Sequence, residues 1–185
     1  NEFDVVVVGA GISGIGAGAH FNLKCPDQTY VILEGRESFG GTWDLFKYPG
    51  IRSDSDMHTL GYSFKPWVHK KSIANAPAIM EYLEETIDEY ELHPHIRYNH
   101  HVETANWSPK EGKWIVSVTD KVNNKEITFK GKLLYMCSGY YKYAHGYEPK
   151  FEGSENFQGQ IVHPQKWSDD VEYENCLLYT SPSPR

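Results

Sequence analysis

The sequence predicts an α/β fold in which a parallel sheet carries a small antiparallel meander. Residues 3–8 read FDVVVV, a largely apolar run that is typical of a strand buried on both faces. Residues 12–23 then place apolar and small side chains at helical spacing, and residues 30–33 form a second apolar strand. This is a β-α-β unit within about thirty residues. Alternating segments and a further apolar run later in the chain supply the meander and another buried strand.

The middle of the chain combines a long loop with one clear helix. Residues 34–67 are rich in glycine, proline and aromatic residues, and an irregular stretch of that length is usually functional. Residues 78–90 have amphipathic spacing and predict a helix, with Asn75 or Ala76 near its cap and Pro77 in its first turn. The rest of the chain predicts four strands, at residues 102–107, 113–119, 126–130 and 132–137. Asn123 and Asn124 lie in a predicted hairpin turn between the second and third of these strands.

Composition limits the classes of function. A chain of 185 residues suggests one domain or slightly more. Its net charge of −7 argues against binding nucleic acid through phosphates. We expect no membrane span, because no run of about 18 apolar residues exists. The absence of a signal segment before Val5 favours a cytoplasmic protein, and three widely spaced cysteines fit a reducing compartment. The histidine pairs lack ligand partners, so no metal site is predicted.

A glycine cluster follows the first strand. Residues 9–14 form GxGxxG between the predicted strand and helix. In such a motif Gly9 permits a tight turn, Gly11 lets a pyrophosphate approach the backbone, and Gly14 allows close packing of helix and strand. The free N–H groups of the helix start, at Ile12 and Ser13, favour an anion. The pattern predicts a Rossmann-like dinucleotide-binding motif, with a ligand-free glycine turn as the alternative.

An acidic residue ends the second predicted strand. Glu34 lies twenty residues after Gly14, where a carboxylate can accept hydrogen bonds from both hydroxyls of an adenosine ribose. The same carboxylate would repel a 2′-phosphate. The residues therefore predict FAD or NAD at this site, and not NADP.

Two further motifs resemble those of flavin monooxygenases. Gly40-Gly41-Thr42-Trp43 is similar to a turn that faces the isoalloxazine end of FAD in that superfamily. Residues 134–139, LYMCSG, resemble the second flavin fingerprint of proteins with two dinucleotide-binding domains. The resemblance implies FAD as the cofactor and adds four candidate cofactor-binding residues, Val102 at the adenine edge and Cys137, Ser138 and Gly139 in the fingerprint.

A longer motif narrows the resemblance. Phe157, Gly159, His163 and Trp167 form F-x-G-x-x-x-H-x-x-x-W, which resembles the fingerprint of type I Baeyer–Villiger monooxygenases. Ser168 departs from the family pattern, which has proline or aspartate there. The resemblance implies that His163 lies at the linker between two nucleotide-binding domains and supports motion linked to NADPH.

Residues 40–67 resemble the ethionamide-monooxygenase-like branch of that family, and within them YPGIRSD, residues 48–54, carries Arg52 and Asp54. The resemblance implies that Arg52 and Asp54 lie beside the flavin, where they are candidates for tuning charge during catalysis. The alternative is a salt bridge within the loop, which contributes little stability when exposed.

The resemblance implies a monooxygenase that uses FAD, NADPH and O2. Such an enzyme inserts one oxygen atom next to a ketone carbonyl to give an ester or lactone, and it can also oxidise a sulfide at sulfur. Two alternatives remain open, a flavin monooxygenase acting on nitrogen or sulfur and a non-catalytic FAD-binding module. Substrate identity cannot be deduced from this sequence.

The motifs also predict a domain division. We expect an FAD-binding domain at residues 1–145, and a linker with the start of a truncated NADPH-binding domain at residues 146–175. Residues 176–185, CLLYTSPSPR, share no periodicity with the preceding chain and are interpreted as a non-native tail, or alternatively as a linker rich in serine and proline. The NADPH motif and the essential arginine of the family have no counterpart here. The resemblance therefore predicts an N-terminal fragment, inactive alone, that lacks the C-terminal part of its own chain.

Overall fold

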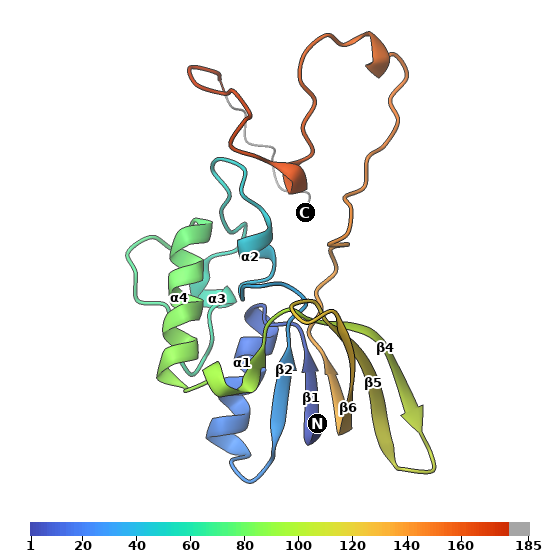
Figure 1. Ribbon diagram of the computed structural model, residues 1–185. Coiled ribbons are helices and arrows are strands. Elements are labelled where there is room, and N and C mark those ends of the chain that lie inside the picture. The colour runs from blue at the N-terminus through green and yellow to red at the C-terminus, as the bar shows by residue number, and fades with distance from the viewer. Residues whose placement is uncertain (178–185) are drawn as a thin grey trace.

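Six strands form one sheet in the computed structural model, which describes residues 1–177 (Figure 1). Their order across the sheet is β3-β2-β1-β6-β5-β4. The strands are β1 (Glu2–Val8), β2 (Tyr30–Leu33), β3 (Ile96–Arg97), β4 (His100–Ser108), β5 (Lys113–Asp120) and β6 (Lys125–Met136). The helices are α1 (Ile12–Lys24), α2 (Thr42–Leu45), α3 (Met57–Leu60) and α4 (Ala76–Glu89), with 3-10 turns at His93–His95, Ser154–Asn156 and Pro164–Lys166.

Strand β1 is the centre of the sheet. It pairs in parallel with β2 on one side and with β6 on the other, which confirms the predicted parallel sheet. Its valines serve two cores, because Val5 and Val7 pack on the helical side and Val6 packs on the opposite side. Burial on both faces explains why this strand is a continuous valine run without alternation.

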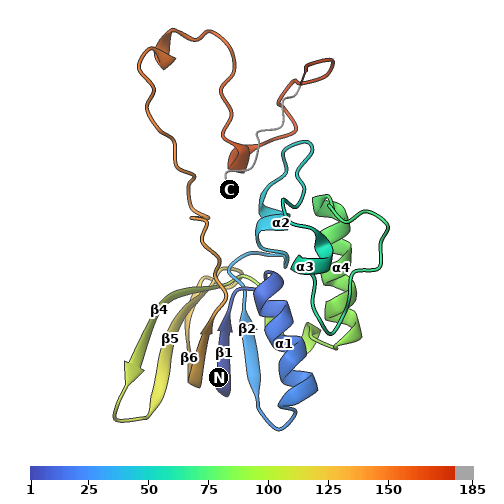
Figure 2. The same ribbon diagram turned by 180° about the vertical axis from the view of Figure 1, so that it is seen from behind.

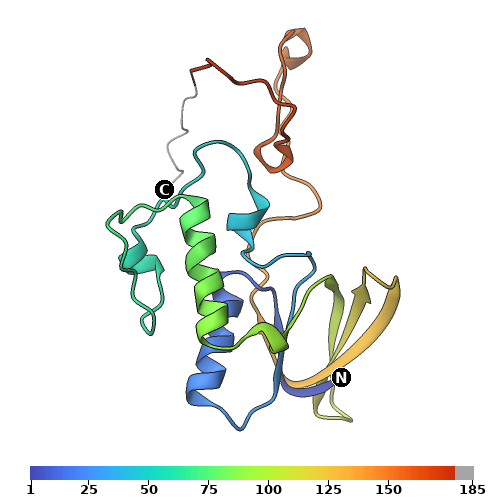
Figure 3. The ribbon, with the colours of Figure 1, turned by 60° about the vertical axis from the view of Figure 1, so that its left-hand side comes forward.

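Helix α1 packs against one face of the sheet, and α4 lies next to α1 on the same side (Figure 3). Helix α4 begins two residues earlier than the periodicity indicates. Its cap is Asn75, whose side-chain oxygen accepts a hydrogen bond from the Ala78 N–H at 3.1 Å. Ile79, Leu83 and Ile87 form the buried stripe that the sequence predicted.

The meander covers the other face of the sheet. Val116, Val118 and Phe129 pack there with Val6 and its neighbours from β2. The sheet therefore curves, so that β4 and β5 lie to one side of β6 and β1 (Figure 2).

Strand β6 corrects the prediction of two separate strands at residues 126–130 and 132–137. It is one strand that exchanges partners near Gly131, since its first half pairs antiparallel with β5 and its second half pairs parallel with β1. A Cβ atom on Gly131 would lie 2.9 Å from a methyl carbon of Val6. The glycine therefore marks a close approach between strands, and not a break.

Smaller differences have local causes. The loop at residues 34–67 contains α2 and α3, and the two-residue strand β3 is too short to leave a periodic signal. In the β5–β6 turn only Asn124 has a positive φ, 48°, while the Asn123 side chain donates to the Asp120 carboxylate at 2.7 Å.

After β6 the chain leaves the sheet and runs as an extended arch through two 3-10 turns (Figures 1 and 2). Most of the predicted tail, residues 178–185, lies outside the described residues. Within residues 1–177 no helix is both long enough and apolar enough to cross a membrane.

The close approach at Gly131 gives a stability test. We expect Gly131→Val to lower the free energy of unfolding by about 1–3 kcal/mol, because the new side chain must displace Val6. Thr128→Val introduces the same side chain at an exposed position of β6 and should change that free energy by less than about 0.5 kcal/mol. Urea denaturation of both variants makes the comparison, and equal effects would show that Gly131 is not a packing constraint.

Candidate dinucleotide-binding site

The carboxyl ends of β1, β2 and β6 meet at one edge of the sheet. The amino end of α1 and the segment that carries α2 lie at the same edge (Figure 1). Ligands of open parallel sheets bind outside the carboxyl ends of the strands. The fold therefore assembles its candidate site from segments that are more than 100 residues apart in sequence.

The three glycines of GxGxxG have different surroundings. Gly9 has a φ of 103°, and a Cβ there would lie 2.6 Å from the carbonyl oxygen of Cys137. A Cβ on Gly14 would overlap the carbonyl oxygen of Gly9. Gly11 differs, because its φ is −80° and the nearest atom to a Cβ there is the Gly41 Cα at 3.7 Å. The fold requires glycine at positions 9 and 14, whereas it leaves room for a side chain at position 11.

Helix α1 begins directly at this edge. Its cap residue is Gly11, which has no side chain to accept from the first-turn N–H groups, and no acidic residue lies in that turn. Ile12 and Ser13 are the first residues of the helix, and Ser13 is exposed. A helix of 13 residues has a partial positive charge at such an end, so the end is suited to a phosphate group.

Glu34 has a role that the sequence did not predict. The residue is only 8% exposed. One carboxylate oxygen accepts a hydrogen bond from the Ala10 N–H at 2.8 Å, and the other accepts from the Arg36 N–H at 2.9 Å. The carboxylate thus fixes the glycine-rich turn against the end of β2. Each oxygen has a second lone pair, so the group retains acceptor capacity for a ribose diol.

The Gly40–Trp43 segment adjoins the glycine-rich turn. The Gly40 N–H donates to the Ala10 carbonyl at 2.9 Å, and Gly41 packs its Cα against Gly11. Thr42 begins α2, and the half-buried Trp43 packs against the core. An ion pair of 2.6 Å between Arg36 and Asp44 holds α2 to the end of β2.

The LYMCSG segment lies on the other side of the turn. The Cys137 N–H donates to the Val8 carbonyl at 2.8 Å, which places Ser138 beside Gly9, and Gly139 follows with a φ of 69°. Burial raises the pKa of the Cys137 thiol to about 11, so the side chain is neutral at physiological pH.

Val102 lies two residues after His100, whose N–H donates to the Glu34 carbonyl at 2.8 Å. This bond brings the start of β4 beside the predicted ribose position. The structure therefore brings together the candidate cofactor-binding residues from five segments, which are Gly9, Gly11, Ile12, Ser13, Gly14, Glu34, Gly41, Thr42, Trp43, Val102, Cys137, Ser138 and Gly139.

Arg52 and Asp54 have different surroundings. Arg52 pairs through its backbone with Asn75 and lines a cleft beside α4. Asp54 lies close enough to Tyr141 to act on it electrostatically: burial first, then the Tyr140 hydroxyl and the negative charges nearby, raise the pKa of Tyr141 to about 12.

Tyr143 is a site residue that the pattern did not distinguish from neighbouring tyrosines. Its hydroxyl lies 3.5 Å from the position of a Cβ on Gly41. Burial raises the pKa of the Tyr143 phenol, and the Glu34 carboxylate raises it further. The phenol is therefore a neutral hydrogen-bonding group above the glycine turn.

The F-x-G-x-x-x-H-x-x-x-W residues are not brought to this edge. Phe157 is exposed, and the His163 Nδ1 accepts from the Gln165 N–H at 3.1 Å while its ring contacts Gly146. The ring of Trp167 lies 5.6 Å from that of Tyr173. The Phe157 ring lies against Gly159. These residues belong to the arch after β6, part of which contacts residues 142–148.

Comparison with known proteins agrees with this geometry. The family described as flavin-binding monooxygenase-like matches residues 3–177. The FAD-containing monooxygenase EthA of Mycolicibacterium smegmatis is 54% identical over 172 residues, which are 93% of this chain and 35% of that protein. The probable FAD-binding monooxygenase AlmA of an Acinetobacter species is 48% identical over 93% of this chain and 34% of its own length.

Solved structures show the same fold. An oxidised steroid monooxygenase bound to NADP has a TM-score of 0.74 and 30% identity, over 94% of this chain and 32% of its own. The cyclohexanone monooxygenase of Rhodococcus sp. Phi1 bound to NADP+ has a TM-score of 0.74 and 28% identity, with the same coverage. The chain thus spans about a third of the length of the proteins that it matches.

The structural role of Glu34 can be tested without any cofactor. We expect Glu34→Ala to lower the free energy of unfolding by about 1–3 kcal/mol in flavin-free protein, because the buried Ala10 N–H loses its acceptor. Glu37→Ala removes the same side chain at an exposed position of the same segment and should have little effect. Urea denaturation gives both values, and similar losses would contradict the structural role.

Proposed function

The chain belongs to the flavin-binding monooxygenase-like family, and from this premise we propose that the protein binds FAD at the glycine-rich edge of its sheet. The single observation that carries the proposal is the space at Gly11. The fold would accept a side chain there, and the space adjoins the uncapped start of α1. A diphosphate is a group of the right charge and size for that position.

The residues present fit the rest of the cofactor. Glu34 would accept from the ribose hydroxyls with its remaining lone pairs, and the backbone near Val102 would adjoin the adenine. Gly41, Thr42 and Trp43 would face the isoalloxazine end. Cys137 and Ser138 would line the diphosphate from the β6 side.

We propose the Baeyer–Villiger type of oxygenation as the reaction of the whole protein. When bound, reduced FAD supplies the activation of O2 by which one oxygen atom is transferred to an organic substrate. Electrons would come from NADPH, and the substrate would be a ketone, or a sulfide oxidised at sulfur. The solved relatives act on steroid and cyclohexanone substrates according to their names, which supports a ketone.

The chain's own residues would set the charge around the flavin. Asp54 would place a negative charge near the ring, whereas the Arg52 side chain lines the cleft beside α4. The neutral thiol of Cys137 and the neutral phenol of Tyr141 add no charge of their own at physiological pH.

We also propose a division of labour along the protein. Residues 1–145 would form the FAD-binding domain, and residues 146–175 would form the linker that carries Phe157, Gly159, His163 and Trp167. The NADPH-binding half would belong to a part of the protein outside this sequence, so the 185 residues alone would not turn over. An N- or S-oxidising flavin monooxygenase is the second candidate, which Trp167 disfavours because those relatives usually end the motif with tyrosine or phenylalanine.

The glycines separate cofactor binding from folding. We expect Gly11→Ser to abolish most flavin retention, by about tenfold or more in affinity, because the side chain fills the diphosphate position. In flavin-free protein its unfolding free energy should be unchanged or slightly raised, since serine is a favoured helix cap. Gly14→Ala should lose flavin retention and should also have a lower free energy of unfolding, because its Cβ overlaps the Gly9 carbonyl. Visible flavin absorbance after gel filtration and urea denaturation are the measurements; full flavin retention by Gly11→Ser would refute the site.

The reaction is tested with protein expressed from the complete gene. Incubation with NADPH, a cyclic ketone and 18O2 should give a lactone with one labelled oxygen, detected by mass spectrometry. Parallel reactions with a sulfide and a tertiary amine serve as comparisons. Labelled sulfoxide or amine oxide without lactone would favour the second candidate, and NADPH consumption without any oxygenated product would contradict both.

A further inference from the structure

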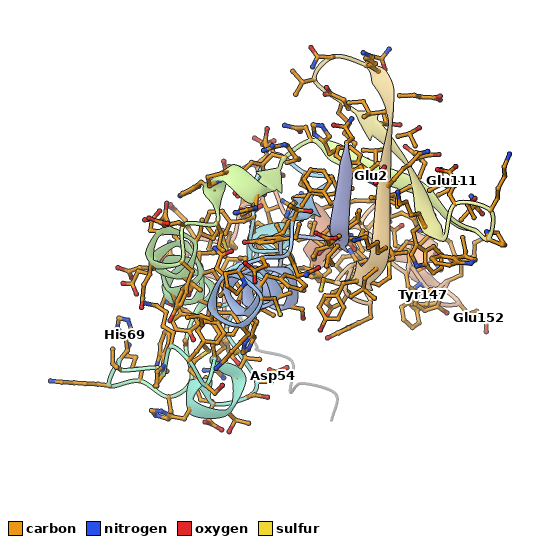
Figure 4. The ribbon with its side chains drawn as sticks, turned by 90° about the horizontal axis from the view of Figure 1, so that it is seen from below. Glu2, Asp54, His69, Glu111, Tyr147 and Glu152 are labelled. Atoms are coloured by element: carbon orange, nitrogen blue, oxygen red, sulfur yellow. The ribbon has the colours of Figure 1, made fainter. Side chains whose placement is uncertain are left out.

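A cleft of about 770 Å³ lies beside the amino end of α4, on the helical side of the molecule. Figure 4 shows His69, which lines the cleft, far from Glu2 on β1 and from Glu111 in the turn between β4 and β5. The lining includes no residue of the glycine-rich turn, of residues 40–43 or of the LYMCSG segment, so the cleft is distinct from the glycine-rich edge. Its volume is within the range of small-molecule sites, roughly 300–1,000 Å³.

The rim of the cleft is positively charged. Arg52, Lys70 and Lys71 line it together with His69, and no aspartate or glutamate does so. Among the described residues, neither Lys70 nor Lys71 takes part in an ion pair, whereas the nearby Lys65 binds Glu89 at 2.6 Å. In a chain with a net charge of −7, this concentration of positive charge creates a local attraction for anions.

The interior of the cleft is mostly apolar. Trp67, which is 5% exposed, and the buried Ala74 line its depth, and Ile73 lies partly exposed on its wall. The Trp67 indole N–H donates to the Lys71 carbonyl at 2.9 Å. This hydrogen bond closes the loop and presents Lys70 and Lys71 above the apolar surface.

We propose that this cleft binds an amphiphilic carboxylate, an anionic group on an apolar chain. The apolar part would lie on Trp67 and Ile73, and the carboxylate would lie among the cationic side chains of the rim. Charged or polar groups at the mouth of an apolar pocket fix the orientation of such a ligand. A small inorganic anion would use the rim alone and leave the apolar interior unfilled.

The cleft shares a wall with the loop that carries Asp54. Its wall includes Arg52, and the Ser53 N–H donates to the Ala74 carbonyl at 2.8 Å. The Ala76 N–H donates in turn to the Ile51 carbonyl at 3.1 Å. Asp54 follows directly on the same loop, so a bound carboxylate adjoins the segment that carries the proposed flavin-proximal charge. The binding itself does not depend on the proposed function.

Octanoate is the probe for this proposal, measured by isothermal titration calorimetry on protein expressed from the complete gene. We expect one saturable site, with octanol and octylammonium binding at least about tenfold more weakly. The double variant K70E/K71E should lose at least about tenfold in octanoate affinity, and binding to the unaltered protein should weaken as salt rises.

The matched control is K110E/K125E, which makes the same charge change at exposed lysines of the meander. It should bind octanoate within about twofold of the unaltered protein. Flavin content is measured for both variants, and equal content shows that folding and the dinucleotide site are intact. Binding is also measured after flavin removal, so that a failure of FAD binding is distinguished from a failure of this cleft.

Three results would overturn the proposal. Equal loss in the two double variants would indicate general electrostatic attraction. Inorganic phosphate that competes as tightly as octanoate would indicate a simple anion site. Binding to vesicles of anionic phospholipid without binding to octanoate would indicate a membrane-facing loop.

Discussion

The buried Glu34 carboxylate beneath the glycine-rich turn is the interaction on which the rest of the site depends. By accepting from Ala10 and Arg36 it joins the end of β1 to the end of β2. The turn is bonded on its other sides as well, since Gly9 donates to the Leu33 carbonyl and Ala10 accepts from Gly40. A buried carboxylate is costly unless both oxygens are satisfied, so these contacts specify one arrangement of the turn. What the arrangement leaves open is the start of α1, which is the part suited to a phosphate.

Sequence reasoning succeeded where local chemistry determines the structure. The β-α-β unit, the two constrained glycines and the Asn75 cap all follow from patterns within a few residues. It failed at Gly131, because a glycine between two lysines and two strand-like segments has the same local appearance whether it ends a strand or admits a neighbouring one. It also did not predict the second role of Glu34, since nothing near that residue in sequence shows that an N–H group 24 residues earlier needs an acceptor.

The loop between β2 and α4 borders both the cleft beside α4 and the segment that carries Asp54. The pattern YPGIRSD placed Arg52 and Asp54 together beside a flavin, and that placement stays a prediction. In the fold the backbone at residues 51–53 is hydrogen-bonded to residues 74–76, so the cleft and the Asp54 segment share one wall. Such proximity arises only from tertiary hydrogen bonds across more than 20 residues, and for this reason the cleft leaves no motif in the sequence.

The second half of β6 shows why the complete gene product is the right material for binding experiments. Among the described residues, positions 132–136 pair only with β1, so the other side of that strand is an open edge. Leu133, Tyr135 and Met136 are each about half exposed there. Open apolar edges promote association between chains. Because Cys137 and Ser138 continue this strand into the dinucleotide site, association at the edge would act next to the position where the diphosphate is proposed to lie. Loss of flavin from the 185 residues alone could therefore reflect association at this edge, whereas loss from the complete gene product would measure the site.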